Sequence, residues 1–350
     1  MSMPEAWRNF IQNQGANLLD AYVLGFQDPA HECALGATND ILMDLSHYPL
    51  LRAKGDEAQS FLHGQLTNDL QALDAHHMQL QAYCSPKGRV ISIMHVLRDG
   101  DDFLLQISDA LLKSTQQRLQ MYMLRAQLTL NHDSDIVAVG IAGPSAKTKL
   151  QAVFGLPPGE VYQVTQHDTV KLIRMPGTVP RFQLIGPIEK MTEYWLKLAA
   201  HFTSVGSHRW AWLTIAAGQP SLYPATQDQF IPQMLNLDLV GGLNFKKGCY
   251  PGQEIVARTH YLGKLKQRMV RANLKSDNLP LPGERLFAAN NNNQSVGQVV
   301  DAQASPQGGF DLLAVVRTAT LADGPLLLGA GDNNAVSLLD LPYSLDKPAS

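Results

Sequence analysis

Two stretches of the chain show the same succession of patterns: a short apolar run, a turn, and then apolar residues spaced three and four apart. In the first stretch the apolar run ends at Arg52, Gly55 provides the turn, and the helical spacing extends over 58–73. In the second, the run 136–142 precedes a helical pattern over 146–154. Such spacing is typical of amphipathic helices that pack on strands. The repetition therefore predicts an α+β fold with a structural duplication.

The segments that follow each pattern support the same fold class. Further strands are predicted at 79–84, 89–97, 102–107 and 181–185, and further helices over 109–124 and 188–202. From residue 264 onward the pattern changes to short β-rich runs separated by Pro- and Gly-containing loops, which is typical of a small barrel. Five strands are predicted there, at 268–274, 283–289, 294–304, 310–317 and 335–341. We therefore expect a peripheral segment 1–38, an α+β region 39–263 and a β-barrel 264–345. The α+β region would comprise two subdomains, 39–130 with 220–263, and 131–219.

Composition excludes several classes of protein. The chain has 350 residues, 45% of them hydrophobic, and a formal net charge of −3, so it can bury a core and carries no overall signal for nucleic-acid binding. No signal peptide is recognisable, and no window approaches the ~20 apolar residues of a membrane span. The three cysteines are far apart, which argues against a disulfide framework, and none forms a C-x-x-C pair that would hold a metal. We expect a soluble, cytoplasmic protein.

The stretch 244–258, NFKKGCYPGQEIVAR, is the most informative segment for chemistry. Cys249 follows two lysines, and nearby positive charge favours the thiolate, which is the nucleophilic form. Gly248 and Gly252 indicate tight turns or the close approach of another group. Residues 255–257 have the apolar character of a buried run. The alternative for Cys249 is a small buried hydrophobe in a turn.

Basic residues concentrate around this stretch. Between positions 246 and 271, Glu254 is the only acidic residue, which predicts a site for an anionic ligand tail or an RNA backbone, or simply a solvated surface. The basic residues are Lys246, Lys247, Arg258, Lys264, Lys266, Arg268 and Arg271.

Residues 247–254, KGCYPGQE, resemble the K-G-C-(Tyr or Phe)-x-G-Q-E signature of the YgfZ family, whose members are folate-binding proteins linked to tRNA modification and iron–sulfur enzyme maintenance. Residues 229–246 and 341–345 are also similar to that family, so the resemblance covers about residues 40–345. A wider resemblance, through 44–47, 61–62 and 68–69, is to the T-protein of glycine cleavage.

The resemblance implies a T-protein-like folate-binding fold, with two repeated α+β halves around a central channel and a C-terminal small β-barrel. It implies tetrahydrofolate or a derivative as ligand, and iron–sulfur client enzymes, such as those that methylthiolate tRNA, as partners. Cys249 would be the functional thiol. The residues implied in folate binding are Tyr48, Trp210, Lys247, Gly248, Gln253, Glu254 and Arg258.

Flat pterin rings stack well on aromatic side chains, which suits Tyr48 and Trp210. For each ring the alternative is core packing, and Trp212 could replace Trp210. The chain departs from the T-protein where that family carries a catalytic carboxylate, because Ser92 and Ile93 occupy the corresponding strand. A conventional aminomethyltransferase is therefore the second hypothesis, followed by a scaffold without folate and a direct RNA binder.

Overall fold

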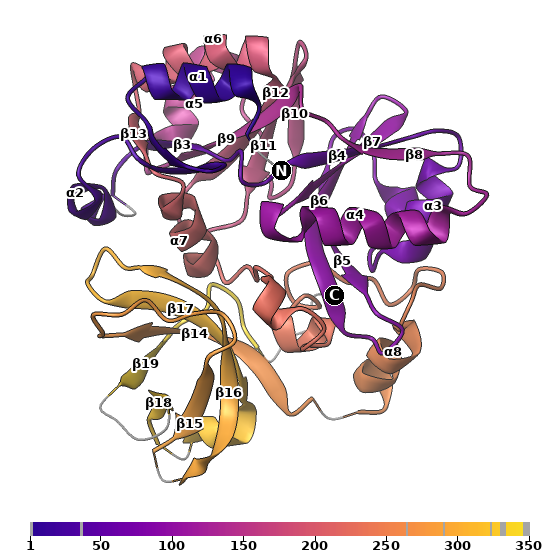
Figure 1. Cartoon of the computed structure of the whole chain (residues 1–350), viewed down its shortest axis with the longest axis vertical. Coiled ribbons are helices and arrows are strands. Elements are labelled where there is room, and N and C mark those ends of the chain that lie inside the picture. The colour runs from indigo at the N-terminus through magenta and orange to yellow at the C-terminus, as the bar shows by residue number, and fades with distance from the viewer. Residues whose placement is uncertain are drawn as a thin grey trace. The chain divides into compact units, whose positions relative to one another are not determined.

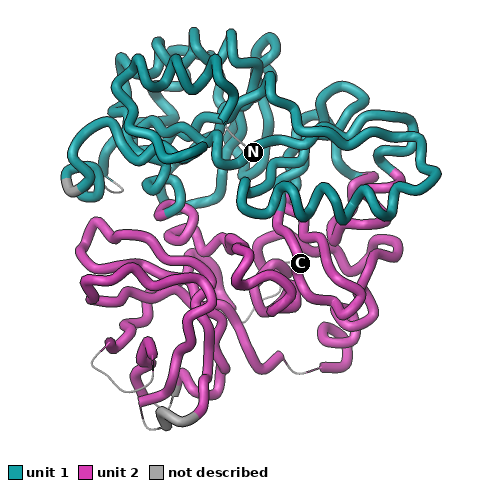
Figure 2. Tube along the Cα trace, viewed as in Figure 1, with its two compact units in different colours: residues 1–59, 72–79, 94–211 teal, residues 60–71, 80–93, 212–350 magenta. Residues whose placement is uncertain are grey.

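The computed structural model describes residues 3–35, 38–263, 265–289, 291–322, 324–329 and 334–345 (Figure 1). The chain divides into two compact units (Figure 2). Unit 1 comprises residues 1–59, 72–79 and 94–211, and unit 2 comprises residues 60–71, 80–93 and 212–350.

The helices of the described residues are mostly short. They are α1 (Glu5–Asn13), α2 (Pro29–Ala34), α3 (Ala58–Gln65), α4 (Asp109–Met123), α5 (Ala146–Phe154), α6 (Ile188–Ala199), α7 (His208–Ala216) and α8 (Gln253–Tyr261). Shorter 3-10 turns occur at η1 (Leu70–Ala72), η2 (Pro224–Thr226), η3 (Pro232–Leu235) and η4 (Thr318–Ala322).

The strands form four sheets. β1 (Asn17–Leu19) pairs with β2 (Tyr22–Gly25). A five-stranded sheet has the order β5 (Met78–Cys84), β6 (Val90–Asp99), β7 (Asp102–Ile107), β4 (Leu50–Lys54), β8 (Thr129–His132). A six-stranded sheet has the order β10 (Val164–His167), β11 (Val170–Met175), β12 (Arg181–Pro187), β9 (Ile136–Ala142), β3 (Ile41–Asp44), β13 (Thr203–Val205). A closed barrel has the order β14 (Gln267–Leu274), β17 (Phe310–Arg317), β16 (Asn291–Ala304), β15 (Arg285–Ala288), β18 (Leu326–Leu328), β19 (Ala335–Leu339).

The order of elements confirms the predicted duplication. The chain passes through β4, α3, β5, β6, β7, α4 and β8, and then through β9, α5, β10, β11, β12, α6 and β13, which is the same succession of strands and helices. The spatial orders β5-β6-β7-β4-β8 and β10-β11-β12-β9-β13 also correspond, except that β3 lies between β9 and β13 in the second sheet. The α+β fold class and the C-terminal barrel are thus confirmed.

One face of the six-stranded sheet carries the main core of unit 1. Alternate residues of a strand point to opposite faces, and Val137, Val139 and Ile141 of β9 all belong to this core. Helices α1, α5 and α6 lie together on the same side (Figure 1) and contribute apolar residues such as Trp195 to it. The opposite face presents Gly140, and a Cβ there would lie 2.6 Å from the Trp210 ring.

The segment before residue 39, expected to be peripheral, contributes to this core. Trp7 and Ile11 of α1 are fully buried, because the two residues lie four positions apart on one helix face that packs on α6. The Trp7 indole Nε1 donates a hydrogen bond to the Asp44 carboxylate, with a donor–acceptor distance of 2.6 Å. Helix α1 is therefore part of the core of unit 1, whereas the sequence pattern predicted that residues 1–38 are peripheral.

The helix predicted over 58–73 is shorter than expected. α3 ends at Gln65, and the next residues leave the helix to pair with the end of β5. Leu66 forms an antiparallel bridge with Tyr83, and the Thr67 hydroxyl accepts a hydrogen bond from the amide of Ala82 at 2.8 Å. The apolar spacing continued past residue 66, but tertiary pairing outweighed helix propensity there.

The barrel forms its own core within unit 2. Alternate residues of β14, including Val270, Ala272 and Leu274, point inward together with residues from the other barrel strands. Five strands were predicted and six are observed, because the three-residue strand β18 is too short to give a periodic pattern. None of the helices found among the described residues has the length and apolarity that crossing a membrane requires.

Replacing Asp44 by Asn tests the buried carboxylate. Burial raises the pKa of Asp44 from 3.8 to about 6, against the hydrogen bonds from Trp7 and Ser46. Between these two values the folded protein holds a proton that the unfolded chain has lost, so this carboxyl makes stability fall as pH rises. Asn does not ionise. The unfolding free energy of Asp44→Asn relative to wild type should therefore rise by up to about 3 kcal/mol from about pH 4 to about pH 7.

Urea unfolding of both proteins across that range measures the difference. Asp101→Asn, at an exposed position, serves as the control for removing a surface carboxylate. A constant difference for Asp44→Asn would show that this carboxyl titrates normally in the folded protein.

Candidate functional site

Cys249 is the exposed cysteine of the chain, whereas Cys33 is partly buried and Cys84 is buried. It lies in the loop that precedes helix α8, in unit 2. Burial raises the pKa of the Cys84 thiol well above its ordinary value, with Asp228 acting in the same direction, so Cys84 stays protonated. The accessible thiol is therefore the one in the K-G-C segment, and the alternative of a small buried hydrophobe at Cys249 is wrong.

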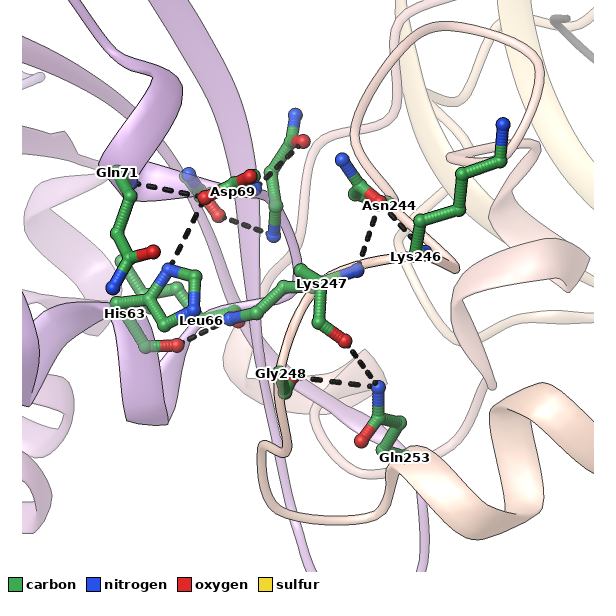
Figure 3. Close-up of polar contacts among 11 residues, drawn as sticks. His63, Leu66, Asp69, Gln71, Asn244, Lys246, Lys247, Gly248 and Gln253 are labelled. Carbon is green, nitrogen blue, oxygen red and sulfur yellow. Dashed lines mark hydrogen bonds and ion pairs between the residues drawn. The ribbon is translucent and has the colours of Figure 1, made fainter.

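Lys247 anchors this loop to the end of helix α3. Its ammonium donates hydrogen bonds to the backbone carbonyls of His63 and Leu66, the latter at 2.6 Å (Figure 3). The last carbonyls of a helix have no partner within it and carry the negative end of the helix dipole, so a cation is favourable there. The Lys247 side chain is mostly buried, and its Nζ atom lies 5.2 Å from the centre of the Tyr250 ring.

Burial also affects the charge of Lys247. It lowers the pKa of the ammonium to about 8, although Asp69 and Cys249 both act to raise it. The effect of Cys249 on this pKa indicates that the ammonium and the thiol lie within electrostatic range of each other.

Side-chain amides shape the backbone on both sides of Lys247 (Figure 3). The Asn244 Oδ1 atom accepts hydrogen bonds from the amides of Lys246 and Lys247, at 2.7 and 3.1 Å. From the other side, the Gln253 Nε2 group donates to the carbonyls of Lys247 and Gly248, at 3.3 and 3.4 Å. Gln253, expected to bind the cofactor, thus has a structural role in holding the K-G-C turn.

The two glycines that flank Cys249 differ in their backbone requirements. Gly252 has φ +78°, and a Cβ there would lie 2.4 Å from the Gly88 nitrogen and from the Ser85 oxygen. A side chain at this position would displace the turn that follows β5. Gly248 has no such constraint, since a Cβ would meet only the His63 Nε2 atom, at 3.5 Å. The expectation from the sequence therefore holds for Gly252 and not for Gly248.

Helix α8 presents most of its residues to solvent. Glu254 and Arg258 are exposed, as expected for groups that meet a ligand or a partner. The expectation that 255–257 is a buried run is wrong: Val256 is fully buried, but Ile255 is 41% exposed. The segment is helical, so consecutive residues face different directions. Lys264, a member of the predicted basic cluster, lies outside the described residues.

His63 is a residue of this site that sequence reasoning missed. It projects from α3, and its Nδ1 atom lies 3.4 Å from the Asp69 carboxylate. Its carbonyl oxygen holds Lys247, and its Nε2 atom faces Gly248. No local spacing connects positions 63 and 247, so only the fold reveals the neighbourhood.

Tyr48 and Trp210 lie in unit 1, and both lie near a buried arginine. The Arg181 guanidinium lies 4.7 Å from the centre of the Trp210 ring, and the phenols of Tyr48 and Tyr162 are within electrostatic range of it. Burial lowers the pKa of Arg181 to about 10, and the two phenols oppose that shift. Gly140 leaves room for the indole, because a Cβ there would lie 2.6 Å from the Trp210 ring. Sequence reasoning assigned the two aromatic residues to one site but missed the arginine that lies against the Trp210 ring.

Trp212 has a different environment from Trp210. Its indole Nε1 donates to the Asp311 carboxylate in unit 2, at 2.9 Å, and its ring is buried. The same carboxylate accepts a hydrogen bond from Arg271 at 3.1 Å. The side chain is therefore a structural contact with β17, which argues against its replacing Trp210.

Strand β6 carries Ser92 and Ile93, the residues that the resemblance leads us to expect in place of the T-protein carboxylate. Ser92 is fully buried, and within the described part of the chain its hydroxyl has no hydrogen-bond partner. Neither Ser92 nor Ile93 can remove a proton as a carboxylate would. In the residues that the structure describes, His, Cys, Asp and Glu side chains nowhere form a group of three or more that could hold a metal ion.

Comparison with known proteins identifies the class of fold. The GCVT N-terminal domain family matches residues 10–178. The crystal structure of glycine cleavage system aminomethyltransferase T from Bartonella henselae superposes with a TM-score of 0.77, covers 99% of each chain, and has 17% sequence identity. The chain thus has the aminomethyltransferase fold, with a cysteine on the K-G-C turn.

Curated relatives then identify the family. The chain is 30% identical over 305 residues to the "tRNA-modifying protein YgfZ" of Yersinia pestis (strain Pestoides F), covering 87% of this chain and 92% of the relative. It is 32% identical over 310 residues to the protein of the same name from Edwardsiella ictaluri (strain 93-146), covering 87% of this chain and 93% of the relative. The chain belongs to the YgfZ family.

A matched pair of glycine substitutions tests the local backbone. Gly252→Ala should lower the unfolding free energy by about 1–3 kcal/mol, because alanine at a positive φ is strained and its methyl group would overlap backbone atoms. Gly248→Ala should change it by less than about 0.5 kcal/mol. Denaturant unfolding of the two variants gives both values, and equal losses would argue against the crowding at Gly252.

Proposed function

We propose that this protein is a folate-binding accessory protein that supports iron–sulfur enzymes and tRNA modification, in particular methylthiolation, through the thiol of Cys249. The observation that carries the proposal is an exposed cysteine within electrostatic range of a buried lysine, on a turn held by three side chains. Membership of a family whose relatives are named tRNA-modifying proteins supports the tRNA role. The proposed clients act on tRNA, so the proposal includes a cytoplasmic location.

The proposed ligand is tetrahydrofolate or a derivative, bound within residues 39–263, with residues 264–345 forming the barrel domain. Tyr48 and Trp210 are the proposed partners of the flat heteroaromatic ring, because their side chains are aromatic and stack well on such rings. In unit 2, the exposed cations Lys246 and Arg258 suit an anionic group such as a glutamate tail on electrostatic grounds. Gly248 and Glu254 remain proposed folate contacts.

The T-protein fold alone does not favour aminomethyl transfer as a second function. That reaction would need a carboxylate near the pterin, and this chain has Ser92 and Ile93 in the corresponding strand. The proposed role of folate is therefore to bind to this protein, and the proposed chemistry belongs to Cys249.

A titration with tetrahydrofolate tests the ligand. Millimolar ligand should raise the melting temperature of the wild type, because a ligand that binds only the folded state must stabilise it. Trp210→Phe should bind about threefold to tenfold more weakly, since the smaller ring loses part of the stacking surface. Tryptophan fluorescence or calorimetry gives the affinities.

Trp212→Phe is the matched control, because it removes an indole two positions away that bonds to Asp311. It should bind as the wild type does. Absence of any stabilisation of the wild type by tetrahydrofolate would refute folate binding.

Cys249→Ala tests the thiol in cells. A strain that carries this variant in place of the wild type should lose most methylthiolated tRNA, as measured by mass spectrometry of digested tRNA. Cys33→Ala, at the partly buried cysteine, is the control and should keep normal levels. Full methylthiolation with Cys249→Ala would remove this thiol from the mechanism.

A further inference from the structure

Three aromatic side chains gather at the C-terminal end of helix α8, all within unit 2. The rings of Phe245 and His260 are stacked, with centroids 3.7 Å apart and an angle of 17° between their planes. The Tyr261 ring lies 4.7 Å from His260, at 80° to it, and 6.2 Å from Phe245. Together with the neighbouring cations Lys246 and Arg258, these rings form what we call the α8 surface.

The other two rings leave one flat face of the His260 imidazole uncovered. Phe245 covers the first face, because the two planes are nearly parallel at stacking distance. Tyr261 lies beside the edge of the imidazole and not over its second face. A ring over that face would be separated from Phe245 by nearly the sum of the other two separations, and the observed 6.2 Å is shorter. His260 is exposed, and Tyr261 is 64% exposed, so the stack ends in an aromatic face that a further flat ring can cover.

The inner end of this stack is fixed by packing. Phe245 is half-buried and packs against a small core cluster formed by Leu243, Tyr250 and Val256. Its ring therefore holds the imidazole of His260 in place before any ligand arrives. A preformed stack loses less side-chain entropy on binding than a mobile one would, which favours recognition.

The charge beside the rings favours an anionic ligand. Lys246 directly follows Phe245 in the chain, and both Lys246 and Arg258 are exposed. Arg258 precedes Tyr261 by three positions, so the two share a face of α8, and it offsets the negative end of the helix dipole in the last turn. Glu254, the only acidic residue between positions 246 and 271, lies in the first turn, at the opposite end of the helix from the rings.

A ligand that combines flat rings with phosphates fits this surface. Unpaired RNA bases stack on aromatic side chains, histidine included, while the RNA backbone meets exposed cations. We propose that the α8 surface binds unpaired nucleotides of tRNA, with a base stacked on His260 beside Tyr261 and phosphates at Lys246 and Arg258. The inference deepens the proposed function, because it rests on the role in tRNA modification and names tRNA as a direct partner. The same cations are proposed to meet a glutamate tail, so RNA and folate would compete for them.

Fluorescence anisotropy with labelled RNA tests the inference without any client enzyme. The probes are an RNA hairpin with an unpaired loop and a blunt duplex with the sequence of its stem. Bases in a duplex are stacked on one another and do not reach a protein ring. Wild type should therefore bind the hairpin at least about fivefold more tightly than the duplex, and an unmodified tRNA transcript should bind as the hairpin does.

Substitutions separate stacking from charge. His260→Ala and Tyr261→Ala should each weaken hairpin binding by about fivefold to tenfold, because each removes an aromatic surface, and should keep its salt dependence. Arg258→Gln should reduce the slope of log affinity against log salt concentration by about 0.7, because one phosphate contact is lost. Melting temperatures show whether each variant is folded, and Tyr261→Ala carries the test of stacking should His260→Ala not fold.

The matched controls lie in unit 1. Tyr122→Ala removes a tyrosine that is 48% exposed, and Arg125→Gln removes an exposed arginine. Both variants should bind the hairpin with the affinity and the salt dependence of the wild type.

Several outcomes would overturn the inference. These are no hairpin binding by the wild type, equal affinity for hairpin and duplex, and ring variants that bind as the wild type does. In the last case any affinity would be non-specific attraction between charges. Loss of tRNA methylthiolation in cells that carry Tyr261→Ala, with RNA affinity unchanged, would mean that the α8 surface contacts a protein instead.

The two proposals fail separately. Normal tRNA methylthiolation with Cys249→Ala would reject the proposed role of the thiol and leave the RNA binding result standing. Methylthiolation that needs Cys249, with RNA affinity that does not depend on His260 or Tyr261, would reject only the inference about the α8 surface.

Discussion

A buried ammonium at the end of a helix is the interaction on which the candidate thiol site depends. Lys247 satisfies two carbonyls at the C-terminal end of α3, and this attaches a loop from late in the sequence to a helix from early in it. Burying a cation is costly unless hydrogen bonds and nearby charge compensate for the lost water. Here the helix terminus supplies both, so the cation can be buried while Cys249, two positions on, remains exposed.

Other contacts in unit 2 hold the loops around Lys247 in place, although these loops have no regular secondary structure. Backbone contacts between the turn after β5 and Gly252 leave no space for a side chain, and the amides of Asn244 and Gln253 fix the backbone around Lys247. Each contact is weak by itself, at about 1 kcal/mol, but together they limit the freedom of an exposed segment. A thiol on a constrained turn is better placed for selective chemistry than one on a mobile loop.

Much of the fold was predictable, because periodic patterns report local structure directly. The strand at Ile136–Ala142 and the helix at Ala146–Phe154 have the predicted bounds. The prediction was wrong where a tertiary contact competes with a local preference, as at Leu66, where strand pairing ends α3. Strand β18 was missed because three residues are too few for a period to appear.

The features of the candidate site also separate into those that the sequence predicted and those that only the fold revealed. The sequence by itself determined the K-G-C segment, the absence of a carboxylate at Ser92 and the family resemblance, because these depend on residue identity and short spacing. It treated the two glycines alike, and only the structure distinguished the crowded Gly252 from Gly248. Only the tertiary structure decided that His63 and Asp69 accompany Lys247, and that Arg181 lies against Trp210. Those neighbours are far apart along the chain, and no local pattern encodes their approach; packing and the burial of charge bring them together.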